Sequence, residues 1–381
     1  MEIIFWFLVL ATLYSYFIYP LVLYTLILCT GKSPLLTSEV ENYTKPKLTL
    51  IITAHNEESR IAEKLKNSLT IRYPHDKLQI LVASDCSTDE TDTIVQEASA
   101  HGVELVRAET RRGKEYAQWL AIKQATGDIL IFSDVATNIP EDAFSVISEI
   151  FIDRDIGAIS SEDKFVTEDN RIVGEGLYVR YEMWLRKIES RLRGVVGLSG
   201  SFFAVRRELC ENWDILVPSD FNTALNCASL GYVAVSDNRL IGIFKDVKNP
   251  KGEYERKVRT IIRGITALSR KLEVLNPAKY GIFSFQVWSH KVMRWLVPWL
   301  MLFTFSVNTQ LLSKHWFYVL SLIIQICFYV IAICGFLSES SRNRIIVRLP
   351  YYFMQANIAI AHATVTFIFG KRVTVWTPSI R

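Results

Sequence analysis

The chain has 381 residues, which is enough for one large domain or two ordinary ones. Half of the residues are hydrophobic although 22% are charged, so the apolar residues must be concentrated in particular segments. The formal net charge of +4 is mild and does not suggest a nucleic-acid partner. The six cysteines lack the paired spacing of metal ligands, so we expect reduced thiols and no zinc site.

The first apolar segment covers residues 3–30 and contains no charge. It exceeds the roughly 20 residues that cross a bilayer, has no basic leading region and shows no convincing cleavage site, so we expect a retained transmembrane anchor at residues 1–31. One acid, Glu2, precedes it, and three lysines follow it: Lys32, Lys45 and Lys47. The positive-inside rule therefore predicts an integral protein of the cell (inner) membrane whose next domain is cytoplasmic.

Strand and helix patterns alternate after residue 46. Four apolar runs have the pattern of buried strands: residues 48–53, 79–84, 103–107 and 128–133. Helix patterns lie between them, and one begins with a capping box formed by Ser87 and Glu90. This alternation predicts an α/β domain with a mostly parallel sheet and flanking helices.

Polar side chains follow three of these strands at the point where each strand ends. His55, Asn56 and Glu57 follow the first strand, Asp85 and Asp89 follow the second, and Asp134 follows the fourth. In an open α/β sheet, ligands bind outside the carboxyl ends of the strands. We therefore expect a site at this edge.

Longer helices are expected in the second half of the domain. A highly charged helix is predicted at residues 175–193, and another begins at Ser219 or Asp220. Residues 253–272 predict a basic, amphipathic helix. Such a helix lies in the membrane interface or docks on the soluble domain through its apolar stripe, and the sequence leaves both possibilities open.

Two further charge-free runs, residues 295–313 and 316–338, predict a helical hairpin in the membrane. A third run, residues 349–370, either crosses the membrane or re-enters it, since a third span would leave a basic tail outside. The predicted domains are an anchor (1–31), a cytoplasmic α/β domain (46–248), amphipathic interfacial helices (249–290), C-terminal membrane helices with two or three spans (291–370) and a tail (371–381).

Six motifs follow one another along the chain. They are AHNEE (54–58), SDCSTDET (84–91), RRGKEYA (111–117), FSDVATN (132–138), GLSGSFFAVRRE (197–208) and SDFNTALNCASLGY (219–232). Their order and spacing, between an N-terminal anchor and a C-terminal membrane bundle, resemble the membrane-bound family 2 glycosyltransferases, relatives of cellulose, chitin and hyaluronan synthases. The resemblance implies a GT-A fold and a nucleotide-sugar donor.

The resemblance assigns the donor to the strand ends. Thr53, His55, Glu57 and Asp85 match the positions that hold the nucleoside. Asp85 is expected to accept a hydrogen bond from the uracil of a UDP-sugar. His55 is expected to stack on the base, or else simply to complete a strand-end turn. Lys114 matches a family lysine near the pyrophosphate or sugar, with an ordinary surface lysine as the alternative.

A divalent cation, Mg²⁺ or Mn²⁺, is the cofactor that the resemblance implies. Asp134 matches the first acid of the family's Asp-x-Asp metal motif, but Ala136 replaces the second acid and cannot bind a metal. Three possibilities remain open: Asp134 holds the ion with phosphates and water, Thr137 or Asn138 contributes, or metal dependence is weak.

The catalytic base implied by the resemblance is Asp220, which would take a proton from the acceptor hydroxyl. A helix N-cap is the alternative for this aspartate. Ser219 replaces the first acid of the family's acidic pair. Ser199 and Gly200, together with Arg206, are expected near the acceptor or the donor sugar.

Processive members of the family carry a Gln-x-x-Arg-Trp motif near the membrane. The corresponding residues here, 256–260, keep the arginine as Arg259 but lack the glutamine and the tryptophan. Arg259 is expected to bind the donor pyrophosphate. The two losses favour a single transfer over polymerisation.

The sequence therefore predicts an inverting hexosyl- or N-acetylhexosaminyltransferase. It would move a sugar from a UDP-sugar to a lipid-linked or glycan acceptor at the cytoplasmic membrane face, in cell-surface polysaccharide or glycolipid biosynthesis. Membrane lipids and polysaccharide-assembly proteins are possible partners. The alternatives are a processive polysaccharide synthase and, because of Ala136 and Ser219, a non-catalytic membrane subunit with a degenerate transferase domain. No Gly-x-Gly-x-x-Gly motif follows the first strand, so a dinucleotide oxidoreductase is disfavoured.

Overall fold

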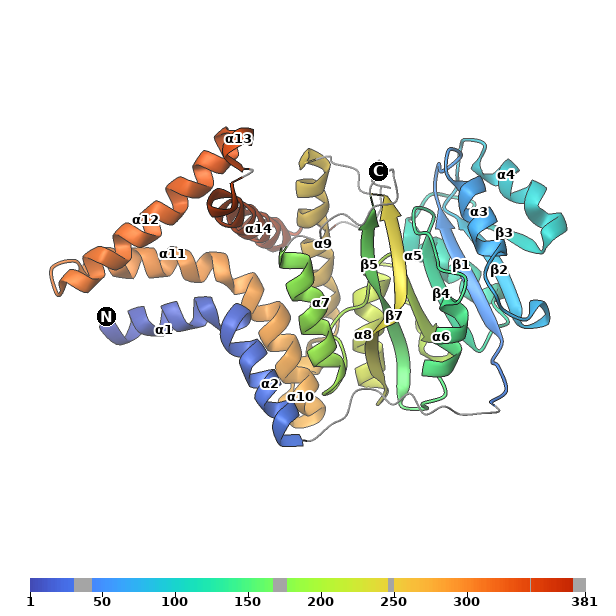
Figure 1. The fold of residues 1–381 in the computed structure, drawn as a ribbon, viewed down its shortest axis with the longest axis horizontal. Coiled ribbons are helices and arrows are strands. Elements are labelled where there is room, and N and C mark those ends of the chain that lie inside the picture. The colour runs from blue at the N-terminus through green and yellow to red at the C-terminus, as the bar shows by residue number, and fades with distance from the viewer. Residues whose placement is uncertain (31–42, 167–176, 246–249, 343, 373–381) are drawn as a thin grey trace. The chain divides into compact units, whose positions relative to one another are not determined.

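The computed structural model describes residues 1–30, 43–166, 177–245, 250–342 and 344–372 (Figure 1). Lys32 and residues 373–381 of the predicted tail lie outside these ranges. The chain divides into two compact units, here called the sheet unit and the helical unit. The sheet unit contains Leu23–Asn249 and Thr266–Ser284, and the helical unit contains Met1–Val22, Pro250–Ile265 and Phe285–Arg372.

Within the described residues, seven strands form one sheet in the order β3-β2-β1-β4-β6-β5-β7. The strands are β1 (Leu48–Ala54), β2 (Leu78–Ser84), β3 (Val103–Arg107), β4 (Ile129–Asp134), β5 (Ile156–Val166), β6 (Phe202–Arg206) and β7 (Val233–Lys245). Among these strands, β6 runs antiparallel to its neighbours β4 and β5, and the other pairs are parallel. The predicted α/β fold with a mostly parallel sheet is confirmed.

Each face of the sheet has its own hydrophobic core, because alternate residues of a strand point to opposite faces. Leu50 and Ile52 of β1 belong to one core, which also contains residues of α3 (Ile61–Leu69), α4 (Thr91–Glu97) and α6 (Ala143–Ile150). Ile51 and Phe132 belong to the other, with residues of α5 (Lys114–Gln124) and α8 (Ser219–Ser229). Helices on both faces explain the uninterrupted apolar strands.

Helix α7 (Leu177–Ser190) precedes β6 in the chain. The predicted amphipathic helix is α9 (Pro250–Arg270), which comes after α8 and β7. The last turn of α9 belongs to the sheet unit. There, Arg270 pairs with Asp214 at 2.8 Å, and the next residue, Lys271, donates a hydrogen bond to Asn226. These two contacts join the end of α9 to the sheet unit, and docking of the helix through its apolar stripe stays a prediction. The short helix α10 (Pro277–Val287) follows.

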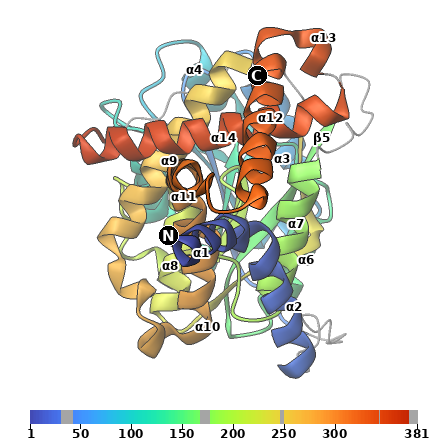
Figure 2. The same cartoon turned by 90° about the vertical axis from the view of Figure 1, so that its left-hand side faces the viewer.

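The helical unit contains most of the remaining helices (Figure 2). They are α1 (Glu2–Leu13), the start of α2 (Tyr19–Thr30), α11 (Met293–Leu311), α12 (Trp316–Leu337), α13 (Glu339–Arg342) and α14 (Ile345–Ile368). A π-helical turn, Tyr14–Ile18, joins α1 to α2, and a second, Trp288–Val292, precedes α11. The Tyr14 hydroxyl and the Ser289 hydroxyl hydrogen-bond at 2.8 Å, so the two turns are packed together.

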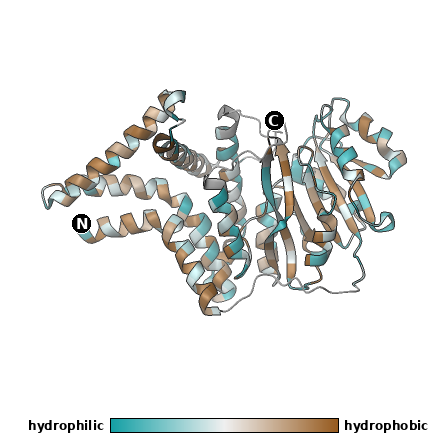
Figure 3. Cartoon of the chain, viewed as in Figure 1, coloured by the Kyte–Doolittle hydropathy of each residue, from teal (hydrophilic) through white to brown (hydrophobic). Residues whose placement is uncertain are grey.

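Two of the described helical segments are long and apolar enough to cross a membrane: Glu2–Thr30 and Trp316–Leu337. Both expose large apolar side chains, among them Phe7 at 67% and Phe336 at 72%, and Figure 3 shows the hydrophobic colour along α12. Exposed apolar surface of this extent indicates membrane association. The helices at the predicted spans 295–313 and 349–370, α11 and α14, have 19 and 24 residues but are not among these apolar segments, so their paths stay predictions.

Candidate functional site

The carboxyl ends of β1, β2 and β4 lie side by side, as the polar residues after these strands predict. The strand register pairs Thr53 with Ala83 of β2 on one side and with Asp134 of β4 on the other. Thr53 is only 1% exposed, and its hydroxyl makes no hydrogen bond within the part of the chain that the structure describes. This edge of the sheet therefore offers an unused hydroxyl beside the carboxylate of Asp134.

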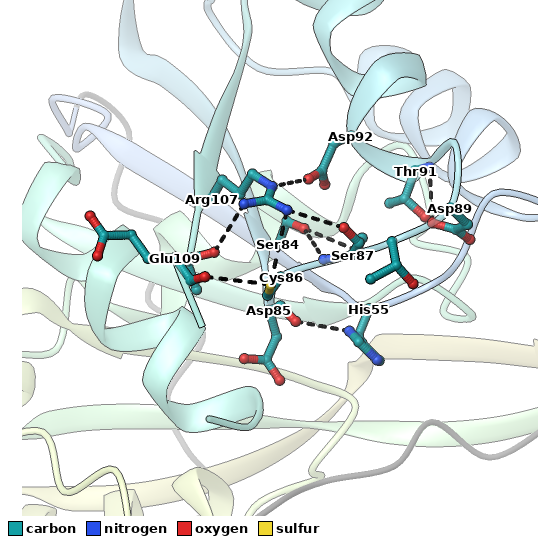
Figure 4. A network of polar contacts seen from close by, with 12 residues as sticks. His55, Ser84, Asp85, Cys86, Ser87, Asp89, Thr91, Asp92, Arg107 and Glu109 are labelled. Atoms are coloured by element: carbon teal, nitrogen blue, oxygen red, sulfur yellow. Dashed lines mark hydrogen bonds and ion pairs between the residues drawn. The ribbon is translucent and has the colours of Figure 1, made fainter. Parts of the chain in front are cut away.

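The loops after β1 and β2 are hydrogen-bonded to each other (Figure 4). His55 donates from Nδ1 to the carbonyl of Asp85 at 2.8 Å, which fixes the plane of its ring. Asn56 accepts from the backbone N–H of Thr88 at 2.9 Å. Asn56 and Cys86 occupy corresponding positions after the two strands, and both have a left-handed backbone, with φ of 52° and 55°. Such strain, rare for a cysteine, is maintained where surrounding contacts determine the loop.

Asp85 is completely buried and positions the beginning of α5. Its two carboxylate oxygens accept the backbone N–H groups of Arg112 and Gly113, each at 2.9 Å. Gly113 has a φ of 102°, which a glycine adopts at little cost, and Lys114 is the first residue of the helix. The expected contact of Asp85 with uracil stays a prediction, and the structure adds a second task, the placement of Lys114.

Glu57 is a buried carboxylate at the end of β1. Its side chain pairs with Arg60 at 2.5 Å, and its backbone N–H donates to the hydroxyl of Thr91 at 2.7 Å. Burial raises the pKa of Glu57 above its ordinary value, and the nearby carboxylates of Asp134 and Asp89 act in the same direction, while Arg60 opposes them. Glu57 therefore lies within electrostatic reach of the strand-end site.

Lys114 and Asp134 form the centre of the site. The Lys114 ammonium donates to Asp134 Oδ1 at 2.5 Å and to the carbonyl of Gly200 at 2.7 Å. No partner for the third N–H of this ammonium lies within the described residues. The alternative of an ordinary surface lysine is contradicted, because Lys114 is only 7% exposed. An ammonium in this position can still donate to an anionic ligand.

A second lysine, Lys64, was not predicted from the sequence. It lies on α3, is 2% exposed, and donates to the hydroxyl of Ser133 at 2.8 Å and to the carbonyl of Thr137 at 2.6 Å. Burial lowers the pKa of Lys64 from 10.5 to about 7, although the charge of Asp134 opposes this shift. Lys64 thus holds the turn that presents Asp134. Its position three residues after Ile61, on the buried face of α3, was the available signal.

Asp220 lies on the other side of Gly200. A Cβ atom added at Gly200 would come 3.1 Å from Asp220 Oδ2, so the absence of a side chain lets this carboxylate approach the loop. The N-cap of α8 is Pro218, and no side-chain capping bond is present there, so Asp220 does not act as the helix cap. The N-cap alternative for Asp220 is therefore not supported.

Ser199 is buried next to this loop. Its hydroxyl donates to Asp163 Oδ1 at 2.7 Å, and its backbone N–H donates to the hydroxyl of Ser160 at 2.7 Å. Asp163 lies on β5 and was not singled out from the sequence, because no motif marks it. Asp163 is therefore a third carboxylate near Gly200, bonded to the residue before it.

Two predicted site residues are not brought to this cluster. Arg206 lies at the opposite end of the sheet, where β6 pairs it with Ile129 at the beginning of β4. Its guanidinium donates to the carbonyls of Phe151, Asp153 and Ile156 at 2.8–3.0 Å. The expectation of a sugar contact for Arg206 is corrected accordingly. Arg259 belongs to the helical unit, and burial together with Arg263 and Arg256 lowers its pKa. Its contact with pyrophosphate stays a prediction.

The residues around Asp134 do not fit the divalent-ion site of the family pattern. Among the described residues, no group of three or more His, Cys, Asp or Glu side chains could hold a metal ion. Thr137 donates its hydroxyl to the carbonyl of Ser201 at 3.2 Å, and Asn138 accepts from Asn67. An ion on Asp134 would also lie beside the Lys114 ammonium, and two like unit charges 4 Å apart repel by about 4 kcal/mol near a protein surface.

The arrangement combines two chemical abilities. The Lys114 ammonium lies at the strand ends, where a ligand can bind, and contacts the carbonyl of Gly200. The Asp220 carboxylate lies next to the Cα of the same glycine. The ammonium can stabilise negative charge, and the carboxylate can accept a proton. These abilities are those that a group transfer with an anionic leaving group requires.

Comparison with known proteins agrees with this geometry. The family model described as Glycosyl transferase family 2 matches residues 49–213. Beta-monoglucosyldiacylglycerol synthase of Nostoc sp. is 24% identical over 183 residues, which are 44% of this chain and 38% of that protein. Poly-beta-1,6-N-acetyl-D-glucosamine synthase of Staphylococcus epidermidis is 24% identical over 175 residues, which are 44% of this chain and 42% of that protein. The chain spans less than half the length of such curated relatives.

A solved structure extends the similarity to the whole fold. The mannosyltransferase PcManGT from Pyrobaculum calidifontis, determined in complex with GDP-Man and Mn²⁺, superposes with a TM-score of 0.73 at 21% identity. The superposition covers 97% of this chain and 99% of that one. The likeness at this level of identity establishes the fold, and the family model establishes the domain. The chain therefore carries a glycosyltransferase family 2 domain of the GT-A fold at residues 49–213.

Proposed function

We propose that the chain is an inverting glycosyltransferase. It transfers a hexosyl or N-acetylhexosaminyl group from a UDP-sugar to a lipid-linked or glycan acceptor at the cytoplasmic face of the membrane. The observation that carries this proposal is the position of Gly200, whose carbonyl binds Lys114 at 2.7 Å and whose Cα side faces Asp220. Gly200 thus contacts a cation, Lys114, and lies beside a possible base, Asp220. The base suits the attacking acceptor hydroxyl, and the cation suits the departing diphosphate of the same transfer.

In the proposed reaction, the acceptor hydroxyl gives its proton to Asp220 as its oxygen attacks the anomeric carbon of the donor sugar. The new glycosidic bond forms on the face opposite the leaving group, so the configuration inverts. The bond between the anomeric carbon and the diphosphate oxygen breaks, and the nucleoside diphosphate leaves with the electron pair. Lys114 stabilises the negative charge that develops on that diphosphate.

The nucleoside is proposed to bind at the ends of β1 and β2. The unused hydroxyl of Thr53 and the ring of His55, which is held by its bond to Asp85, supply a donor or acceptor and a stacking surface there. The resemblance favours uracil, whereas the solved structure of similar fold contains GDP-Man. A donor panel must therefore include GDP-mannose beside the UDP-sugars.

The acceptor is proposed to be membrane-linked. The apolar segments Glu2–Thr30 and Trp316–Leu337 support attachment of the domain to a bilayer, and the lysines after the first segment support a cytoplasmic domain at residues 46–248. One relative is named for synthesis of a glycolipid and another for a polysaccharide. We favour one transfer per acceptor, in cell-surface polysaccharide or glycolipid biosynthesis, because the Gln and Trp of the processive motif are absent.

The test is nucleoside diphosphate release by the full-length protein purified in detergent. UDP-sugars and GDP-mannose are supplied one at a time with a membrane lipid extract. We expect release with one UDP-sugar, its loss in Asp220→Asn, and its retention in Asp142→Asn, an exposed aspartate before α6. Donor binding without turnover across the panel would instead support a non-catalytic subunit.

A second measurement distinguishes single transfer from polymerisation. Products made from a radiolabelled donor are separated by size under donor excess. We expect a product with one added sugar. A ladder or a long polymer would replace this proposal with a processive synthase.

A further inference from the structure

The contacts of Asp134 and Lys114 raise a question that the proposed function leaves open: what neutralises the donor diphosphate. A divalent ion needs oxygen ligands, and it usually takes one or two carboxylates as well as phosphates and water. Here Ala136 supplies no ligand, and Lys114 already occupies Oδ1 of Asp134 at 2.5 Å. The single carboxylate of the motif thus serves an ammonium.

This ammonium is fixed by the fold rather than by a flexible surface position. Asp85 holds the backbone of Arg112 and Gly113, which sets the first turn of α5 and with it Lys114. Asp134 and the carbonyl of Gly200 then hold the side-chain end of Lys114. A cation restrained from both ends loses little entropy when an anion binds, which is the condition for effective preorganised stabilisation.

The other side of Asp134 is supported by a second cation. Lys64 lies beneath the turn, where it donates to Ser133 at 2.8 Å and to the carbonyl of Thr137 at 2.6 Å. Its charge interacts with Asp134. Below its pKa of about 7, Lys64 adds a second positive charge to that of Lys114. A doubly charged ion on Asp134 would in any case lie beside the Lys114 ammonium.

We infer that Lys114 takes the place of the divalent ion at the donor diphosphate, so that nucleotide binding and transfer in this chain need no divalent cation. The inference rests on the proposed function only in its use of a nucleoside diphosphate. Asp134 acts in it as a positioning residue for Lys114, and the third N–H of Lys114 donates to a phosphate oxygen. Charge-assisted contacts of this kind are about twice as strong as neutral ones.

The experiment measures the binding of UDP and, in parallel, of GDP to the full-length protein by calorimetry, with chelator, with Mg²⁺ and with Mn²⁺. We expect the Kd of whichever nucleotide binds to agree within about threefold in all three conditions. A Kd at least about tenfold weaker in chelator would overturn the inference. The preference between UDP and GDP tests the proposed donor separately, and binding of neither would overturn both.

Variants of α5 supply the matched comparison. Lys114→Met is expected to weaken nucleotide binding by about 10-fold to 100-fold, the loss of one charge-assisted hydrogen bond, and Lys114→Arg by less. Lys123→Met removes a lysine of the same helix that packs on the Trp119 ring, and it is expected to bind as the wild type does. Unchanged binding in Lys114→Met would overturn the inference.

A direct probe of the metal completes the test without relying on activity. Mn²⁺ bound to a protein loses its free-ion paramagnetic resonance signal, so titration of Mn²⁺ into protein with saturating UDP reports a protein-held ion. We expect the signal to fall no further than it does with UDP alone. A stoichiometric loss of signal that disappears in Asp134→Ala would overturn the inference, even if the Lys114 variants fold poorly.

Discussion

The two ends of the β-sheet use charged side chains in different ways. At the end formed by β6 and the beginning of β4, Arg206 donates to three backbone carbonyls, and Asp128 accepts the backbone N–H of Lys47 at 3.1 Å. At the carboxyl end, Lys114 pairs with Asp134, and Lys64 donates to the Ser133 hydroxyl and the Thr137 carbonyl of the turn that carries Asp134. Arg206 bonds to backbone carbonyls and holds chain segments together, whereas Lys114 also pairs with a carboxylate and keeps an N–H for a ligand.

The largest effect at the carboxyl end of the sheet is expected at Asp220, which lies beside the loop that binds Lys114. Asp220→Asn keeps the size of the side chain but removes the base, so we expect the rate of transfer to fall by about 100-fold to 10,000-fold. The melting temperature in detergent should stay close to that of the wild type, because Asp220 makes no capping bond in α8. A loss of activity that merely follows a loss of folded protein, seen by size-exclusion chromatography, would contradict a catalytic role.

Lys64 offers a test by pH. Its folded-state pKa of about 7 lies below the ordinary 10.5, so between these values the unfolded chain binds a proton that the folded chain does not. Stability therefore increases with pH from about 7 upward, by about 2 kcal/mol between pH 7 and 9. Relative to Lys64→Met, the melting temperature of the wild type should rise over this interval, and parallel curves would show that Lys64 does not titrate there.

Arg206 is expected to behave in the opposite manner to Asp220. Arg206→Gln removes bonds to the carbonyls of Phe151, Asp153 and Ile156 and should cost about 1–3 kcal/mol of stability. The activity per folded molecule should stay within about twofold of the wild type, since Arg206 lies away from the site. Arg207→Gln, which loses a single 3.3 Å bond to Ala125, is the control and should be milder. A selective loss of activity in Arg206→Gln would restore the sugar-contact prediction.

Among the residues of the site, the smallest effect on activity is expected at Ser199. Ser199→Ala loses the 2.7 Å bond to the Asp163 carboxylate, which is worth about 1.5–3 kcal/mol in stability. The loop around Gly200 keeps its backbone contacts, including the bond from Lys114, so activity should fall by less than about tenfold. Kinetic assays at saturating donor and varied acceptor measure this change, and a loss as large as that of Asp220→Asn would move Ser199 into the catalytic machinery.

Much of the fold follows from local sequence pattern. Apolar runs that end in His55, Asp85 and Asp134 predicted parallel strands, and the register of β1 with β2 and β4 brings these ends together. The position of Lys114 at the start of α5 likewise follows from the glycine before it. These features depend on residues that are neighbours in the sequence, so the sequence pattern predicts them.

The rest depends on contacts between distant segments. Arg206 follows a site motif in the sequence, but β6 runs antiparallel to β4, and its five residues carry the chain about 16 Å away from Gly200. Lys64 and Asp163 belong to no motif and join the site only because α3 and β5 lie beside β4 and the 198–201 loop. Strand direction and helix docking are set by tertiary packing, which a single sequence does not display.

The paired π-helical turns, Tyr14–Ile18 and Trp288–Val292, have a consequence for length variation in this chain. Each turn accommodates one residue more than an α-helical turn would, so it resembles an insertion that the helix has absorbed. Deleting one residue within such a turn would restore α-helical spacing and leave the flanking helices close to their present phase. The same deletion elsewhere in α1 or α11 would rotate everything on one side by about 100°. Single-residue deletions should therefore be tolerated better in these turns than in the helices beside them, at the cost of the bond between Tyr14 and Ser289.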